Sequence, residues 1–208
     1  MRLHLPAALF IVATLLNTNS THAQAAPRPQ LRVAASSFAS VEVHLNARPI
    51  GRDWYEEDAG LAGPARITIR YGQPHARGRK IVGGLIPNDS VWRFGANEAT
   101  TLHTDLDMTI GGFAIPRGDY TLYLAHAKDT WSLIVNSGTG TWGTDRNPAK
   151  DLGRITMKAR TTTDNEDALT IYLDPQSAKP SSGYASLDGT MRIRWGTIEL
   201  SAPWTIKQ

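Results

Sequence analysis

The chain has 208 residues, no cysteine and six tryptophans, and its 22 Lys and Arg exceed its 19 Asp and Glu by three. Without cysteine it forms no disulfide, iron–sulfur cluster or thiolate metal site, and it has no cysteine nucleophile. A net charge of +3 is too small for the surface of a nucleic-acid-binding protein. The length fits one ordinary domain and argues against a separate cofactor-binding domain.

The first 25 residues have the three-part pattern of a secretory signal. Arg2 is followed by an apolar run over residues 5–16 and by a polar stretch that ends in small residues. Cleavage after Ala23 or after Ala25 fits this pattern equally well. The apolar run is shorter than the roughly twenty residues that span a bilayer as a helix, and no later segment is long enough to do so. We therefore expect a periplasmic or secreted protein without a membrane span after signal removal.

The rest of the chain divides into a short lead-in and one domain. Residues 26–35 contain two prolines and no apolar period, which predicts a flexible lead-in to a single domain over residues 36–208. Within that domain apolar residues recur at every second position, the period of half-buried strands. The clearest runs are Ile67, Ile69 and Tyr71; Tyr120, Leu122 and Leu124; Ile155 and Met157; Leu169, Ile171 and Leu173; and Met191, Ile193 and Trp195.

Turn residues separate these runs, and no segment of a dozen residues after the signal keeps a helical period. The pattern predicts an all-β fold, namely a predominantly antiparallel β-sandwich with long ordered loops and little helix. Residues 72–97 form the longest expected loop, and their apolar residues argue against disorder. A second long loop is expected over residues 136–153, an acidic loop over 53–58 and a turn over 165–167.

The long loop carries a distinctive motif. The sequences GRKIVGGLIP at 78–87 and VWRFGANEAT at 91–100 resemble the signature of the bacterial domain of unknown function 2911 family. The resemblance continues in IPRGDYTL at 115–122 and in the Trp142-Gly143 pair, whereas residues 49–64 look like an insertion. The resemblance implies an exported, β-rich domain, and it brings no established activity, substrate or catalytic residue.

Basic residues concentrate around the same loop. Residues 66–98 hold six Lys and Arg against Asp89 and Glu98, a net charge of +4. Arginines on a glycine-rich loop suit the binding of a carboxylate, sulfate or phosphate. They equally suit solvated strand and loop positions, with Arg93 paired to Glu98 to hold the loop. Both interpretations stay open at this point.

The residues that we select for a ligand site combine an aromatic face, a planar cation, an amide and a carboxylate, which a pocket for a polar ligand such as a sugar requires. The same residues also suit a packed corner, with the tryptophan in the core and the asparagine in a turn. Trp131 and Trp195 are expected in the core, and the loop residues Trp54 and Trp142 are expected to be exposed. The candidate ligand-binding residues are Arg79, Trp92, Arg93, Asn97, Glu98 and Trp142.

Other chemistry has little support. His44 and His126 lie in predicted strands, where we expect no carboxylate partner. The run His103-x-Asp105-x-Asp107 has metal-ligand types on one strand face, but the aspartates suit the turn into the next strand better. We predict neither a metal nor a cofactor, and the catalytic residues, if any, are unknown; nucleophile-elbow and phosphate-loop motifs are absent from the sequence.

We therefore expect a binding module that holds a polar or anionic small molecule, or a glycan, beside the 78–98 loop. One alternative is an interaction or structural protein of the cell envelope. Another is a hydrolase that uses Glu98 as general base, which requires a second acid or base facing the same cavity. The sequence does not define the oligomeric state.

Overall fold

The computed structural model describes Arg32 and residues 34–45, 47–50, 54–57, 65–176 and 187–207. The predicted signal, residues 1–25, and most of the predicted lead-in lie outside the described residues. The described residues from 34 onward belong to one compact unit. No helix in the part of the chain that the structure describes is long and apolar enough to cross a membrane.

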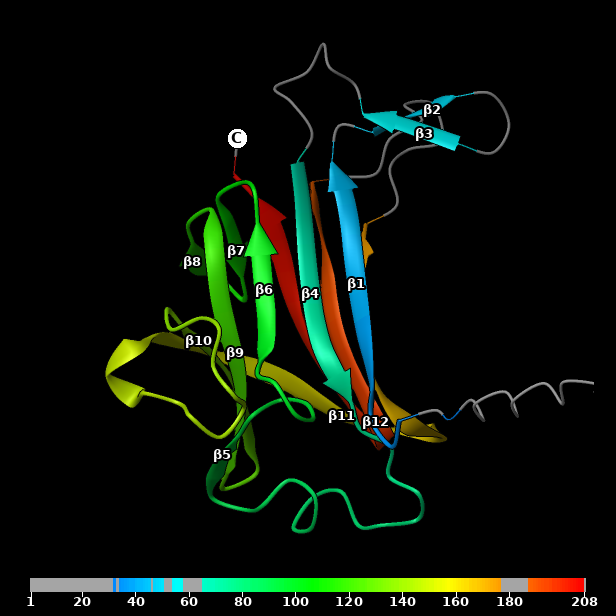
Figure 1. The fold of residues 1–208 in the computed structure, drawn as a ribbon, viewed down its shortest axis with the longest axis vertical. Coiled ribbons are helices and arrows are strands. Elements are labelled where there is room, and N and C mark those ends of the chain that lie inside the picture. The colour runs from blue at the N-terminus through cyan, green and yellow to red at the C-terminus, as the bar shows by residue number, and fades with distance from the viewer. Residues whose placement is uncertain are drawn as a thin grey trace, which may run out of the picture. The chain divides into compact units, whose positions relative to one another are not determined.

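Strands make up nearly all the regular structure of this unit (Figure 1). One short 3-10 helix, η1, begins at Pro148, directly before a long strand. The elements are β1 (Ser37–Leu45), β2 (Ala47–Ile50), β3 (Trp54–Glu57), β4 (Ala65–Gln73), β5 (Ser90–Trp92), β6 (Thr100–Thr104), β7 (Met108–Ile110), β8 (Phe113–Ile115), β9 (Gly118–Ala127), β10 (Thr130–Asn136), η1 (Pro148–Lys150), β11 (Asp151–Pro175) and β12 (Asp188–Ile206).

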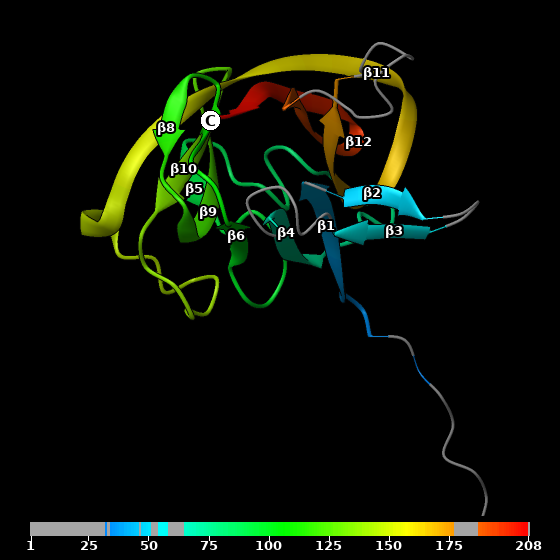
Figure 2. The ribbon, with the colours of Figure 1, turned by 90° about the horizontal axis from the view of Figure 1, so that it is seen from above.

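Ten of the strands form one antiparallel sheet, which confirms the all-β, antiparallel prediction. The order is β1-β4-β6-β9-β10-β11-β12-β7-β8, and β5 pairs with β9 outside this path. The 25-residue strand β11 pairs with β10 through its first part and with β12 through the rest. Seen from above, β11 curves from β10 round to β12 (Figure 2). In the view of Figure 1, β12 therefore lies behind the strands β1 and β4. The sheet thereby folds back and encloses one core.

The chain just after β4 joins the two parts of the folded sheet. His75 forms an antiparallel bridge with Ala168 of β11, and the Leu169 amide donates to the Pro74 carbonyl at 2.9 Å. The buried Tyr71 hydroxyl accepts a hydrogen bond from the Ile171 amide at 3.2 Å, and burial raises its pKa above the ordinary value. These bonds close the sheet beside the entrance to the long loop.

The interior is filled by the apolar residues that recur at every second position in the sequence. Every member of the apolar runs that the sequence predicts is buried. Trp131 and Trp195 are also in the core, as expected, and Trp92 stacks on Trp195 with ring centroids 5.5 Å apart. A smaller apolar cluster of Tyr123, Ala125 and Ile134 lies on the other face of the same strands. The face of β9 and β10 that points away from the core is therefore covered too.

Three segments differ from the sequence-based expectation. The predicted acidic loop forms β3, which pairs with β2 in a separate two-stranded sheet. The predicted turn at 165–167 lies inside β11, where the pairing register with β12 shifts between Thr161 and Thr170. A bulged strand leaves residues unpaired and bends, and for this reason its polar residues mimic a turn signal. The 72–97 loop also contains β5, a strand of three residues.

Candidate functional site

The floor of the candidate site consists of two strands whose polar residues face away from the core. Thr101 of β6 is directly opposite Thr121 of β9. Leu102 and Leu122, the next residues on each strand, are fully buried in the core. Because successive side chains on a strand point to opposite faces, both threonines lie on the outer face of the sheet.

The wall of the site is the loop over residues 137–150, which folds back over this outer face. Asn136 fixes both ends of the loop: its side chain accepts from the Gly138 amide at 2.8 Å and donates to the Asn147 carbonyl at 2.9 Å. The Thr121 hydroxyl donates to the Gly138 carbonyl at 2.5 Å and so holds the loop against β9. Arg146 pairs with Asp151 and lies over the Tyr123 ring, 5.7 Å from its centroid. A loop bonded this densely presents a fixed surface.

A backbone bridge joins this wall to the end of the signature loop, the segment 78–98 that carries the motif. Glu98 and Trp142 form an antiparallel bridge, and the Gly143 amide donates to the Asn97 carbonyl at 3.1 Å. The Ala99 amide donates to the Thr141 carbonyl at 3.4 Å. The two long loops that the sequence predicts separately therefore meet at one place.

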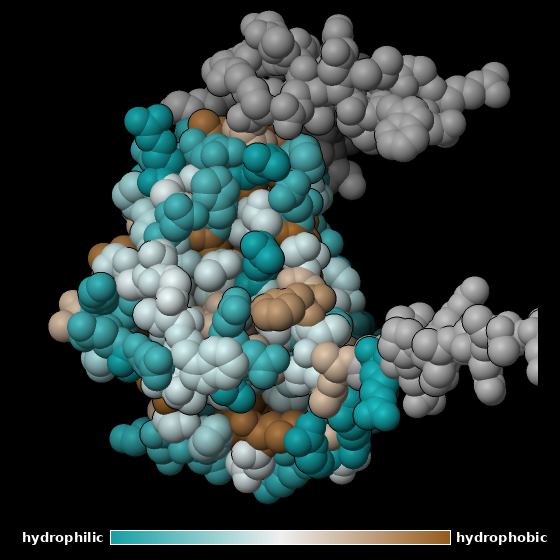
Figure 3. All heavy atoms as spheres, in the orientation of Figure 1, coloured by the Kyte–Doolittle hydropathy of each residue, from teal (hydrophilic) through white to brown (hydrophobic). Residues whose placement is uncertain are grey.

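Between floor and wall lies a hollow of about 290 Å³. Trp142 at this hollow is 51% exposed, one of the few large apolar side chains in the described residues to be so exposed. The Thr141 hydroxyl is buried and has no hydrogen-bond partner among the described residues. The lining residues are Glu98, Ala99, Thr101, Thr121, Gly140, Thr141 and Trp142. In Figure 3, hydrophilic and intermediate colours predominate over the middle of the visible face of the molecule.

Of the six residues selected from the sequence, Glu98 and Trp142 line the hollow. Arg93 and Asn97 are not among its lining residues, but both contact Gly143, the residue after Trp142. Asn97 has a φ of 63°, the turn conformation that asparagine tolerates, and its carbonyl holds Gly143. The Arg93 side chain donates from Nε to the Gly95 carbonyl at 3.2 Å and packs against Gly143. No ion pair joins Arg93 to Glu98 within the described chain, so the proposed Arg93–Glu98 pairing is wrong.

The other two selected residues lie elsewhere. Arg79 donates to the carbonyls of Ala76 at 3.0 Å and His75 at 2.6 Å, so its guanidinium holds the start of its own loop. Trp92 is buried on the inner face of the sheet, away from the hollow. The ligand-binding role assigned to all six residues stays a prediction.

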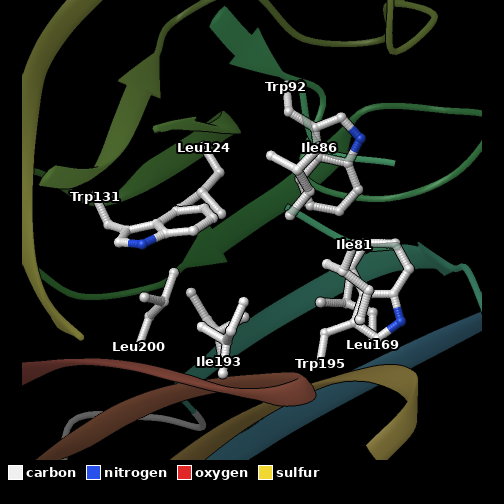
Figure 4. A pocket seen from close by; sticks show the side chains of 10 residues that line it. Ile81, Ile86, Trp92, Leu124, Trp131, Leu169, Ile193, Trp195 and Leu200 are labelled. Carbon is white, nitrogen blue, oxygen red and sulfur yellow. The ribbon is translucent and has the colours of Figure 1, made fainter. Parts of the chain in front are cut away.

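Trp92 belongs to an apolar cavity under the signature loop (Figure 4). The side chains of Ile81 and Ile86 come from the loop, and Trp131 and Leu200 come from the strands. The cavity measures about 20 Å³, roughly the space of one water molecule. Its lining is apolar, so the loop is anchored by packing into the core, and the cavity is too small for a ligand.

His44 and His103 both have carboxylate partners in the structure. His44 contacts Glu42 at 2.6 Å, so the expectation that it has no carboxylate partner is wrong. His103 Nδ1 lies 2.8 Å from Asp119, and its Nε2 lies 2.9 Å from Asp105. These two hydrogen bonds, first that to Asp119, raise the pKa of His103. Among the described residues no group of three His, Asp or Glu side chains is arranged to hold a metal ion.

Sequence reasoning missed the three threonines of the hollow. Thr101 and Thr121 come together only through the β6–β9 register, and Thr141 joins them only through the loop. The one local signal is that Thr101 and Thr121 occupy outward positions in alternating strands. Threonine is common at such positions, so this signal does not single them out.

The fold and the hollow define an all-β protein with one folded antiparallel sheet and a polar site on its outer face. The chain matches the sequence profile of the family described as protein of unknown function (DUF2911) over residues 57–203. This match spans more than half of the chain, so the protein belongs to that family, as the resemblance predicted. Searches among curated proteins and among solved structures find no match.

Proposed function

We propose that the protein is a binding module that holds a hydroxyl-rich small molecule, most simply one sugar unit of a glycan, in the hollow of Glu98 and Trp142. The observation that carries the proposal is the exposed Trp142 ring at a hollow lined by one carboxylate and three threonines. An indole face offers apolar contact to a sugar ring, and the oxygens of Glu98 and of the half-buried Thr101 offer hydrogen bonds to its hydroxyls.

The size of the hollow limits the ligand. Pockets for small molecules in proteins typically measure about 300–1,000 Å³, and 290 Å³ is just below this range. One ring with its substituents fits such a volume, whereas a longer glycan must extend beyond it. The dense bonding of the 137–150 loop keeps the hollow formed before the ligand arrives, which lowers the entropic cost of binding.

Binding is better supported than hydrolysis. A hydrolase of the kind considered above needs two carboxylates, or a carboxylate and a histidine, that face one cavity. Among the described residues that line the hollow, Glu98 is the single titratable side chain. Glu98 therefore serves here as a hydrogen-bond acceptor. The predicted signal adds the proposal that the protein acts in the periplasm or outside the cell.

The test is a thermal-shift screen of the full mature chain with methyl glycosides of glucose, galactose, mannose, N-acetylglucosamine and their uronic acids. At a ligand concentration 100 times Kd, the melting temperature should rise by about 5–10 °C. Trp142→Ala should abolish the rise, and Glu98→Gln should reduce it. The matched control is Phe38→Ala, because Phe38 is an aromatic residue of similar exposure (59%) on β1. No rise with any glycoside, or an unchanged rise in Trp142→Ala, would remove the proposal.

A further inference from the structure

A row of outward-facing side chains continues from the hollow onto the next strand. Arg70 of β4 is directly opposite Thr101 of β6, which in turn is opposite Thr121 of β9. Ile69 and Tyr71, on either side of Arg70 in sequence, are buried, and Arg70 is exposed. Arg70 therefore projects from the same outer face as the two threonines of the floor.

The spacing places the Arg70 guanidinium within reach of the hollow. Side chains directly opposite each other on antiparallel strands have Cβ atoms about 4.5–5.5 Å apart. The long arginine side chain can span this distance and lie over Thr101, at the border of the hollow. Arg70 is thus one strand away from Thr101, and Glu98, which also lines the hollow, precedes Thr101 by three residues along the chain.

The surroundings of Arg70 leave its charge available. Within the described chain, no Asp or Glu lies within 4.0 Å of its guanidinium. Its register neighbours are Ser40 on β1 and Thr101 on β6. The nearest carboxylate by register, that of Glu42, is occupied by the Thr68 hydroxyl at 2.8 Å and by His44. A guanidinium that has no carboxylate partner within the protein can bind the carboxylate of a ligand through two parallel hydrogen bonds.

From this geometry we propose that Arg70 forms a carboxylate subsite beside the hollow, and that the preferred ligand is an acidic sugar. The inference rests on the proposed function and narrows the ligand class from sugars in general to acidic sugars. The sugar ring lies against Trp142 with its hydroxyls toward Glu98 and Thr101. Its carboxylate lies toward Arg70, because the negative charge of Glu98 repels it from the other side. The opposite charges of Glu98 and Arg70 orient the ligand.

The test compares matched pairs of ligands that differ only at one carbon. Methyl β-glucuronide and methyl β-glucoside, together with methyl galacturonide and methyl galactoside, are titrated into the wild-type protein by NMR. The acid of at least one pair should bind about ten times more tightly than its neutral partner at 0.05 M NaCl. At 0.5 M NaCl this difference should shrink severalfold, because salt screens exposed charges.

Variants locate the effect. Arg70→Gln should remove the preference for the acid while leaving neutral binding unchanged, and Arg70→Lys should keep part of it. The control Arg66→Gln changes the net charge equally on the same strand and face, and it should keep the full preference. Equal binding of acid and neutral glycosides, or a full preference in Arg70→Gln, overturns the carboxylate subsite and leaves the proposed function standing. Failure of every glycoside to bind overturns both.

Discussion

Glu98 and Trp142 face each other across an antiparallel bridge that joins the signature loop to the 137–150 loop. Glu98 comes from a chain segment that Ile86 and other apolar side chains anchor in the core. Trp142 comes from a loop held by Asn136, Thr121 and Arg146. Two independently anchored segments thus fix the backbone positions of Glu98 and Trp142 relative to each other, as a preformed binding site requires.

The bridge depends on the absence of a side chain at position 143. A Cβ atom there would lie 2.6 Å from Arg93 Cδ and 2.8 Å from the Asn97 carbonyl oxygen. The second of these atoms belongs to the backbone and cannot move without breaking the bridge. Gly143→Ala should therefore lower the free energy of unfolding by about 1–3 kcal/mol and abolish saccharide binding. Urea unfolding and glycoside titration measure the two effects.

Gly112→Ala is the control for this substitution. Gly112 has a φ of 81° in the turn between β7 and β8, and a Cβ there meets no atom within 4 Å. Its substitution should cost about 1 kcal/mol through backbone strain alone and leave binding intact. Equal loss of binding in both variants would show that stability, and not the bridge, controls the site.

The signature loop is predicted to be held mainly by its buried isoleucine. Ile86 is 3% exposed and lines the small apolar cavity. Ile86→Ala should lower the free energy of unfolding by about 3 kcal/mol, because it removes buried methyl groups and enlarges the cavity. Val82→Ala, at a half-buried position of the same loop, should cost about 1 kcal/mol or less. If urea unfolding shows that both variants lose a similar amount of unfolding free energy, the claim that Ile86 is the main anchor of the loop is contradicted.

The clamp of His103 between Asp119 and Asp105 predicts a pH-dependent stability. The pKa of His103 is raised in the folded protein, chiefly by its hydrogen bond to Asp119. The contribution of His103 to the free energy of unfolding is therefore complete below its pKa in the unfolded chain, about 6.5. It is lost as the pH rises through the pKa in the folded protein. Since the side chain is 42% exposed, the effect should stay below about 1 kcal/mol.

The measurement is the difference in unfolding free energy between the wild type and His103→Gln from about pH 5 to pH 9. This difference should be largest at the acid end and decline toward the alkaline end. Asp119→Asn should flatten the decline, because it removes the main partner of the imidazolium. A difference that grows with pH would have the wrong sign for a raised pKa.

The core was predictable because burial follows a local pattern. Ile67, Ile69 and Tyr71 alternate with polar residues, and this alternation by itself assigns them to the inner face. The turn conformation of Asn97 was one of the two interpretations that its residue type allowed, since its side chain tolerates a positive φ. Such features need no knowledge of which strands are neighbours.

The site was only partly predictable because it depends on non-local pairing. The motif indicated Glu98, and loop composition indicated Trp142, but only the β6–β9 register adds Thr101 and Thr121. Trp92 has the same motif context as Glu98, yet it is in the core, because alternation in β5 turns it inward. The basic residues of the 66–98 segment likewise have different surroundings: Arg79 binds its own loop, whereas Arg70 is opposite Thr101 of the floor.

The most direct test of the central claim is an NMR titration that locates the ligand. The protein is labelled at threonine methyl groups and tryptophan indoles and titrated with the glycoside that gives the largest thermal shift. The resonances of Thr101, Thr121, Thr141 and Trp142 should move together, with one Kd, while those of Trp92 and Trp195 stay in place. Movement of the Trp92 and Trp195 indoles with a stationary Trp142 would place the ligand under the signature loop and contradict the account.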